Sequence, residues 1–266
     1  MRLVMLGLPP ATNNMYATVP DKGPKTGVRR RAARVVLSAA GRASHKAWRA
    51  VAARKHAGPP SGAPFAVLVV YHLHRLDRDV DGSHKAVLDG FKGVLWRDDK
   101  QVVLLGARKD LVPREVFPYV TVVVRELAAM PSYRPQEAPG GALAFETNIW
   151  PPTTNNAYAL SGGRRRKTAA ARAAGDAYTL WMSRLVRHPP AIEGPARLRI
   201  RYGIAVDRRD VEGSHKIHVD AMRGVAWRDD ADVMSFSVSK ARLPKGAQPV
   251  IDVVTWAMPG ARQGRP

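Results

Sequence analysis

The sequence predicts an α+β fold made of two similar units, each a small mixed sheet with two helices. The first reason is a repeat, because residues 78–99 and 209–230 are identical at 14 of 22 positions, at an offset of 131. The second reason is that both copies order their predicted strands and helices in the same way. A chain of 266 residues is long enough for two domains of ordinary size.

The elements of the first copy follow from apolar patterns and their breakers. The run MRLVMLGL predicts a first strand, which two prolines end before Thr-Asn-Asn and a basic loop. A stretch rich in alanine and arginine, without internal proline, predicts a long helix at 31–56. A strand at 67–75, the repeated acidic motif and a second helix come next. Apolar runs then predict strands at 102–108 and 119–125.

The second copy repeats this plan with a different loop length. Pro-Pro-x-Thr-Asn-Asn recurs there at an offset of 142. A long helix is predicted at 166–187, and strands at 197–206, 233–240 and 250–256. Between the copies, the proline and glycine content is typical of a connector. We therefore predict domains at 1–129 and 144–258, a linker at 130–143 and a tail at 259–266.

Composition narrows the class of function. Lys and Arg number 43 against 22 Asp and Glu, so the net charge is +21 and the pI about 11.0. This charge favours nucleic acid as a partner, although a coding bias toward arginine would also produce it. The lack of cysteine excludes disulfides and thiolate chemistry and fits a reducing cytoplasm. No signal peptide or membrane span is evident, so we expect a cytoplasmic protein without a membrane partner.

The repeated motif places carboxylates where a strand meets a helix. In the first copy Asp79 and Asp81 follow the predicted strand, and Asp99 lies in the loop after the next helix. The spacing lets Asp81, Lys85 and Asp89 share one helix face. Several carboxylates without thiols favour a hard cation, Mg²⁺ or Mn²⁺, over zinc. Such a cation would make the acids compatible with DNA, generate hydroxide and stabilise phosphodiester charge, with Lys85 assisting.

A structural role is the alternative for these acids. Asp81 and Ser83 could cap the second helix, and Asp98 with Asp99 could form a turn. The spacing preserved in two copies weighs against that explanation.

Two other residue types in the motif invite functional roles. His84 and His215 could be bases or ligands, but we expect them to be exposed residues of a first helical turn. Trp96 and Trp227 are expected to be packing anchors and not platforms on which bases stack.

The order of motifs resembles the RusA family of Holliday-junction resolvases, metal-dependent endodeoxyribonucleases of bacteria and phages. The motifs are Pro-Pro-x-x-Asn-Asn-x-Tyr, Arg-Asp-x-Asp-x-x-x-Lys-x-x-x-Asp and Gly-x-x-Trp-x-Asp-Asp, and the resemblance spans both halves. It implies Mg²⁺-dependent cleavage of branched DNA, such as a four-way junction, in recombination and repair. It also implies the residues that bind metal, Asp79, Asp81, Asp99, Asp210, Glu212 and Asp230, and the essential lysines, Lys85 and Lys216.

Three departures from the family pattern matter. Both copies have glycine, at Gly82 and Gly213, where the family usually has asparagine. Glu212 replaces the aspartate found at Asp81 and is one methylene longer, enough to displace a metal ligand. The glutamine that commonly follows the Asp-Asp pair is kept as Gln101 but replaced by Asp232. The last two changes predict that the second copy is the weaker or inactive half.

Further residues are candidates for DNA contact. Paired asparagines follow each Pro-Pro and could form turns or approach the DNA backbone; they are Asn13, Asn14, Asn155 and Asn156. Basic runs at the start of the long helices predict phosphate contacts that position the DNA, namely Arg29, Arg30, Arg31, Arg164, Arg165 and Arg166.

Resolution of a four-way junction needs two symmetric nicks, which the resemblance assigns to a twofold dimer. One chain with two copies can supply that symmetry, so we expect a monomer that acts as a pseudo-dimer. Three alternatives remain open at this point. They are a non-catalytic DNA-binding protein on the same fold, a broader flap or fork nuclease, and a nickase with only the first site active.

Overall fold

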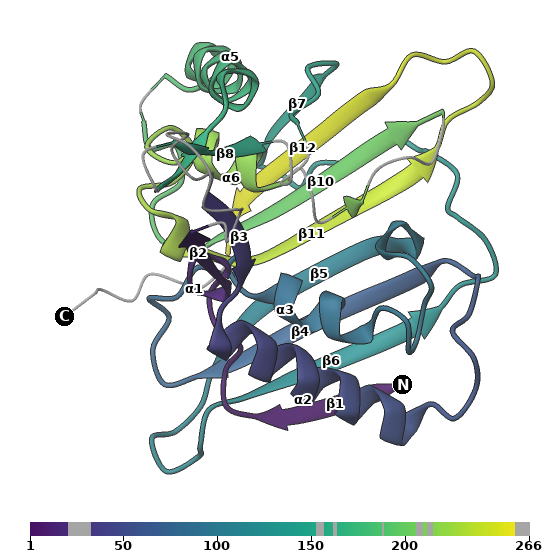
Figure 1. The fold of residues 1–266 in the computed structure, drawn as a ribbon. Helices are drawn as coiled ribbons and strands as arrows, with labels where there is room; N and C mark the ends of the chain where they lie inside the picture. Colours follow the sequence, from purple (N-terminus) through teal and green to yellow (C-terminus); the bar gives the residue numbers. More distant parts are fainter. Residues whose placement is uncertain are drawn as a thin grey trace, which may run out of the picture.

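The computed structural model describes residues 1–20, 33–152, 157–161, 164–187, 189–205, 210–211 and 215–258. Within these residues the main feature is one eight-stranded mixed sheet with the order β1-β6-β4-β5-β11-β10-β12-β7 (Figure 1). The first four strands of that order come from the first half of the chain and the last four from the second. The α+β class is confirmed, but the two predicted small sheets are joined into one.

The predicted strands of both copies are present, with ends shifted by at most a few residues. The first half forms β1 (Arg2–Leu6), β4 (Phe65–Leu73), β5 (Val102–Leu111) and β6 (Tyr119–Glu126). The second half forms β7 (Leu143–Thr147), β10 (Ala196–Ile204), β11 (Val233–Arg242) and β12 (Val250–Ala257). In each half the strand before the acidic motif, β4 or β10, pairs in parallel with the strand after it, β5 or β11.

The two halves meet through antiparallel pairing of β5 with β11. Gly106 faces Ser237 in this register, and Leu104 faces Ser239 while Arg108 faces Ser235. These pairs exchange equivalent positions of the repeat, because each residue of β11 lies 131 positions after its counterpart in β5. The pairing is therefore self-complementary, as an isologous twofold interface is.

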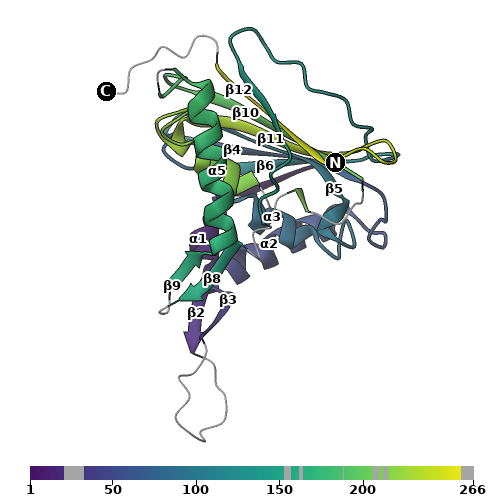
Figure 2. The same ribbon diagram turned by 90° about the horizontal axis from the view of Figure 1, so that it is seen from above.

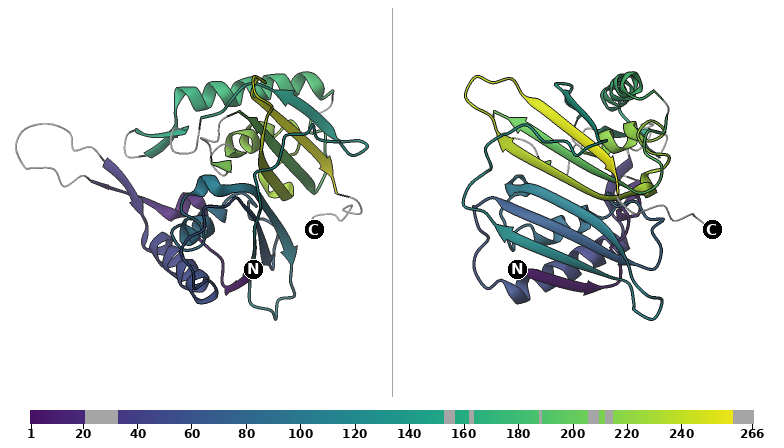
Figure 3. Two further views of the ribbon diagram at one scale, coloured as in Figure 1. Left: turned by 90° about the vertical axis from the view of Figure 1, so that its right-hand side faces the viewer. Right: turned by 180° about the vertical axis from the view of Figure 1, so that it is seen from behind.

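Helices cover one face of the sheet. They are α2 (Ala39–Lys55), α3 (His84–Phe91), α5 (Ala169–Leu185) and α6 (His215–Met222). Figure 2 and the left view of Figure 3 show all four on the same side. The side chains between helices and sheet form a continuous core that includes the fully buried Trp48, Trp96 and Trp227. Burial of both motif tryptophans confirms their predicted packing role.

The long helices begin later than predicted. A strand, β3 (Ala33–Leu37), occupies the expected first turns, because the β-branched run Arg-Val-Val-Leu favours extended backbone. The side chain of Ser38 then caps α2 by accepting a hydrogen bond from the Gly41 N–H at 3.0 Å. Thr168 caps α5 in the same way through the Ala171 N–H.

Each long helix is preceded by a two-stranded hairpin, where the sequence predicts a basic loop. In the first half β2 (Tyr16–Pro20) pairs with β3, and in the second β8 (Tyr158–Ser161) pairs with β9 (Arg164–Lys167). A short helix, α1 (Thr12–Met15), carries the first Asn-Asn pair. Both hairpins project from the helix-covered side of the sheet (Figure 2).

The predicted linker is docked on the second half. The Tyr133 N–H donates to the carbonyl of Arg242, its hydroxyl donates to Asp252 Oδ2 at 2.7 Å, and its ring approaches Gly203 so closely that a Cβ there would lie 2.9 Å from it. The right view of Figure 3 shows this segment crossing the side of the sheet away from the helices. Strand β7 begins at Leu143, the last residue of the predicted linker. No helix in the described part of the chain is long and apolar enough to cross a membrane.

Candidate active site

The acidic motif of the first half lies between β4 and α3, with its last acid beyond α3. Asp79 is exposed, whereas Asp81 is only 4% exposed and Asp99 only 8%. Asp81 precedes the first residue of α3, so it does not share a helix face with Lys85 as predicted. Only the second part of that prediction holds, because Lys85 Nζ lies 3.2 Å from Asp89 Oδ1.

The partners of Asp81 come from the other half of the chain. Lys216 Nζ lies 3.1 Å from Asp81 Oδ2, 3.0 Å from Asp220 Oδ1 and 3.8 Å from Asp230 Oδ2. Asp79 interacts electrostatically with Lys216 as well as with Asp81. We call Asp79, Asp81, Lys216 and Asp230 the Asp81 centre.

The corresponding group on the other side also mixes the two halves. Asp210, in the second half, interacts electrostatically with Asp98 and Asp99 of the first half. Asp99 Oδ2 also lies 3.2 Å from Lys92 Nζ. We call Asp99 and Asp210 the Asp210 centre. Its remaining predicted acid, Glu212, lies outside the described residues.

The structure thus groups the acids differently from the sequence prediction. That prediction placed Asp79, Asp81 and Asp99 of one copy around one metal. The structure instead brings Asp81 to Asp230, the counterpart of Asp99 in the repeat. The physical reason is the β5–β11 pairing, which sets the strand ends of one half against the acidic turn of the other. Sequence spacing within one copy carries no information about that contact.

Burial and mutual repulsion raise the pKa of several of these acids. Burial raises the pKa of Asp230 to about 6, although Lys216 counteracts this. Although Asp79 is exposed at the surface, partial desolvation by its neighbours and the charge of Asp81 raise its pKa. The pKa of Asp210 is raised by burial and by Asp99. Burial alone would lower the pKa of Lys216, but the surrounding carboxylates raise it above its ordinary value. The acids are therefore held at a cost in free energy, as at functional sites.

The buried tryptophans hold the third acid of each centre. Trp96 Nε1 donates to Asp99 Oδ1 at 3.0 Å, and Trp227 Nε1 donates to Asp230 Oδ1 at 3.3 Å. Each acid begins a short 3-10 helix, η1 (Asp99–Gln101) or η3 (Asp230–Asp232). Packing and a hydrogen bond therefore fix one carboxylate oxygen of each of these acids, and the other oxygen faces the centre.

The residue three positions into each acidic turn completes a capping box. Gln101 Oε1 accepts from the Asp98 N–H at 2.9 Å, and Asp232 Oδ2 accepts from the Asp229 N–H at 3.1 Å. Asp232 therefore keeps the capping bond of the glutamine that it replaces. It lacks the amide with which Gln101 also donates to the carbonyls of Ser61 and Ala63.

The donor set fits a hard divalent cation. Asp81 Oδ2 and Asp210 Oδ1 are buried, and neither has a hydrogen-bond partner among the described residues, although Lys216 Nζ lies 3.1 Å from Asp81 Oδ2. Such oxygens are costly to bury unless a cation meets them. No three histidine, aspartate or glutamate side chains of the described residues already stand close enough to hold a metal. In the Asp81 centre, the Lys216 ammonium contacts both acids instead.

Two buried lysines are not among the site residues that the sequence predicts. Lys109 on β5 is 4% exposed, and its counterpart Lys240 on β11 is 1% exposed. Lys109 Nζ donates to the carbonyls of Leu76 and Arg78 and, at 2.6 Å, to that of Ala231 in the other half. Lys240 Nζ donates across the interface to the carbonyl of Lys100. A lysine at the same place in an apolar strand of both copies was the signal that could have found them.

The predicted exposure of the two motif histidines is wrong. His84 and His215 are 3% and 1% exposed, not exposed as expected. They begin α3 and α6, and their rings lie 4.9 Å apart, each packed near Phe236. Burial lowers the pKa of both to about 3, so both are neutral at pH 7. The first turns of these helices face each other across the interface, which a single copy cannot reveal.

The predicted DNA contacts are only partly described. Asn14 and Arg166 are exposed, on α1 and β9. The backbone positions of Asn13, Arg164 and Arg165 are in α1 and β9, but their side chains lie outside what the structure describes. Outside the described residues altogether are Arg29, Arg30, Arg31, Asn155 and Asn156.

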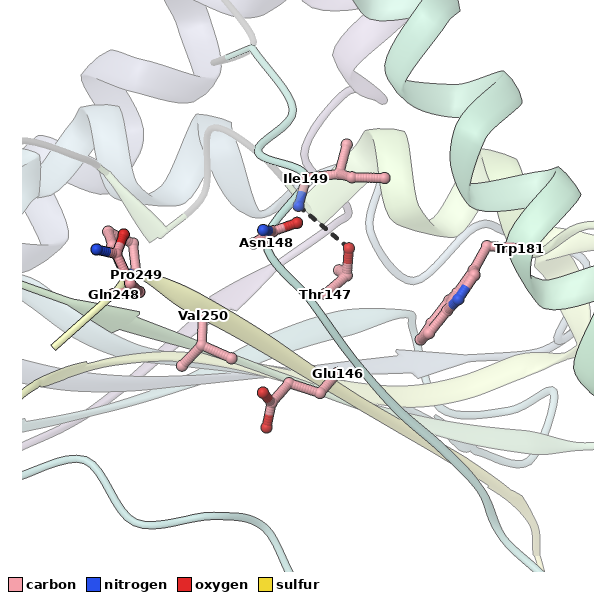
Figure 4. A pocket seen from close by; sticks show the side chains of 8 residues that line it. All are labelled: Glu146, Thr147, Asn148, Ile149, Trp181, Gln248, Pro249 and Val250. Atoms are coloured by element: carbon pink, nitrogen blue, oxygen red, sulfur yellow. Dashed lines mark hydrogen bonds between the residues drawn. The ribbon is translucent and has the colours of Figure 1, made fainter.

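A pocket of about 480 Å³ lies apart from these acids, between the end of β7, the turn from β11 to β12, and α5 (Figure 4). Trp181 and Glu146 border it, and it contains none of the residues of either centre. The pocket is therefore not part of the candidate active site.

Buried carboxylates and lysines gathered at strand ends of a strongly basic chain are the features of a nuclease. In the comparison with known families, residues 18–125 match the model described as Endodeoxyribonuclease RusA. The first half of the chain therefore carries a domain similar to the RusA endodeoxyribonucleases. The match includes Asp79, Asp81, Lys85 and Asp99, while the second copy lies beyond it. A comparison with curated proteins finds no match.

Proposed function

We propose that the chain is an Mg²⁺-dependent, structure-specific endodeoxyribonuclease that cuts four-way junctions or other branched DNA in recombination and repair. The observation that carries the proposal is the meeting of Asp81 with Lys216 and Asp230 from the other copy. Paired centres built from both copies explain why one chain retains two sets of acids. On this account the chain acts in the cytoplasm as a monomer, its two RusA-like domains forming a pseudo-dimer.

The carboxylates of the Asp81 centre are the residues that would hold the cation. When bound, Mg²⁺ or Mn²⁺ would supply a water of lowered pKa and stabilise the charge that builds on the phosphodiester. Asp79, Asp81 and Asp230 must be ionised to take this role. The Trp227 N–H favours the ionised form of Asp230, because its hydrogen bond lowers the pKa of that acid.

Lys216 supplies the positive charge of the centre. Its ammonium keeps two buried carboxylates from repelling each other, and in the complex it would neutralise the charged phosphate oxygens. Hydrolysis adds water across one P–O bond, leaving a phosphate monoester and a free hydroxyl. Asp210, Glu212, Asp99 and Lys85 would have the same roles in the other centre, and the roles of all these residues remain predictions.

The basic hairpins are the proposed contacts to the DNA arms. The β8–β9 hairpin carries the arginine run 164–166, and both hairpins project from the side that also carries α3 and α6, whose first turns adjoin the centres (Figure 2). Their positive charge would bind phosphates without reading bases, which suits a substrate defined by its branched shape.

A second candidate is a nickase, and specific substitutions favour it. Glu212 replaces an aspartate, and Asp232 lacks the amide of Gln101. Both changes lie in the second copy. Asp232 adjoins Asp230 of the Asp81 centre and keeps the capping bond, whereas Glu212 lies two positions after Asp210 in the sequence and is itself a predicted metal ligand. The Asp210 centre is therefore the one expected to be weaker.

The test is cleavage of a synthetic four-way junction and of linear duplex, each with Mg²⁺ or with EDTA. We expect Mg²⁺-dependent cutting that prefers the junction, and equal cutting of flaps or forks would indicate the broader nuclease. Asp79→Asn should reduce the rate of one cut at least a hundredfold and leave junction binding intact. Asp110→Asn, which removes a carboxylate paired with Arg108 instead, is the matched control and should cut normally. Binding without metal-dependent cleavage would support the non-catalytic alternative and end the proposal.

A further inference from the structure

We propose that Lys109 and Lys240 are positioning residues, each fastening the acids that the two copies contribute to one centre. The proposal rests on the function proposed above. It adds a requirement: the distance between acids from different copies is set by a buried ammonium and not by the sheet alone.

The contacts of Lys109 carry the argument. Its Nζ donates to Leu76 O at 3.0 Å, Arg78 O at 3.0 Å and Ala231 O at 2.6 Å. An ammonium has three N–H groups, so all of them are used. Two of the acceptors belong to the segment that leads directly into Asp79, and the third directly follows Asp230. One charge thus joins the backbone of both acid-bearing segments of the Asp81 centre.

Lys240 has the symmetric place in the other centre. It lies 131 residues after Lys109, and its acceptor, the carbonyl of Lys100, directly follows Asp99. Lys100 is the repeat counterpart of Ala231, so the same bond is made in both directions across the interface. The same hydrogen bond is made in both copies although their sequences have diverged, which argues against an incidental contact.

The burial of Lys109 indicates that this residue positions other groups, because a buried ammonium is a poor way to stabilise the fold. A buried ammonium carries a desolvation cost, and an apolar residue of similar volume would fill the same space without it. Burial also lowers the pKa of Lys109 to about 8. A methionine at this position would fill the space but could not donate hydrogen bonds to the carbonyls of two separate segments. Loss of the ammonium should therefore loosen both segments together and weaken the cation site that they form.

The first experiment measures metal affinity without DNA. Mn²⁺ binding is followed by electron paramagnetic resonance on full-length chain carrying Asp210→Asn, so that the Asp81 centre dominates. We expect Lys109→Met to weaken Mn²⁺ binding at least tenfold, and Lys245→Met, an equal loss of charge at an exposed turn, to change it less than twofold. Unchanged Mn²⁺ affinity of Lys109→Met would overturn the proposal.

The second experiment separates position from stability. Because the chain has no cysteine, Lys109→Cys can be aminoethylated in denaturant and refolded, which restores an ammonium at this one place. Mn²⁺ affinity should return to within about threefold of the parent chain. Failure of the refolded, aminoethylated protein to recover affinity would contradict a positioning role.

The third experiment does not depend on the proposed function. Amide hydrogen exchange in the metal-free chain should rise together at 79–81 and 230–232 in Lys109→Met, but not in Lys245→Met. If the parent chain binds no Mn²⁺ and cuts no junction, the proposed function fails while this exchange pattern still tests Lys109. Independent behaviour of the two segments would contradict the proposal.

Discussion

At the scale of single residues, the centres depend on side chains that hold the acids as much as on the acids. Trp227 illustrates this, since it is fully buried and donates to Asp230 at 3.3 Å. The sequence predicted the packing of this tryptophan but not its hydrogen bond, because residue type shows burial more readily than orientation. The buried histidines were mispredicted for a related reason, as their environment is made by the other copy.

The raised pKa of Asp230 predicts how cleavage depends on pH. Its pKa of about 6 means that the acid gains a proton, and loses its capacity to hold a cation, as pH falls through about 6. At subsaturating Mg²⁺ the cut made by the Asp81 centre should fall about tenfold for each unit below that value. The measurement is strand-resolved cleavage from pH 5 to 8. A cut that stays constant down to pH 5 would contradict the assignment of Asp230.

Trp227→Phe should move this acidic limb toward higher pH. The hydrogen bond from the indole favours the ionised acid, and a bond to a charged group is worth about 1.5–3 kcal/mol, so its loss shifts the limb by about one to two pH units. The matched variant is Trp96→Phe, which loses its bond to Asp99 and should leave this cut unshifted. Identical pH profiles for the two variants would show that the indoles only pack.

At the scale of elements, apolar patterning predicted every strand of the main sheet but could not show how the strands of the two copies pair. The hairpins before the long helices were missed, because β3 and β9 follow basic loops whose composition resembles that of the helices. The pairing of β5 with β11 is a contact between distant segments, and no local pattern encodes it. This pairing is the element that assembles both centres.

Ser237→Pro tests that pairing. Ser237 lies in the middle of β11 with a strand on each side, so proline there removes a ladder hydrogen bond and is poorly tolerated. We expect both cuts of a junction to be lost together, with circular dichroism showing that the helices persist. Ser237→Val keeps the N–H and suits a strand, so it should cut like the parent chain. Normal cleavage by Ser237→Pro would show that the centres do not need this interface.

At the scale of the whole molecule, the repeat predicted two units and their basic character, and the structure shows how they are combined. Residues of one copy are completed by residues of the other, so the boundary between copies runs through each centre. The chain has a net charge of +21, yet it gathers two groups of acids. Because each centre uses residues of both copies, a substitution in the second copy can affect either centre.

The most direct test of composite centres compares Asp79→Asn, Asp99→Asn and Asp230→Asn on a four-way junction with each strand labelled. If the centres mix the copies, Asp230→Asn loses the same cut as Asp79→Asn, and Asp99→Asn retains it. This holds whether or not the Asp210 centre is active. If instead Asp99→Asn loses the cut that Asp79→Asn loses, and Asp230→Asn retains it, each centre is built within one copy and the account is wrong.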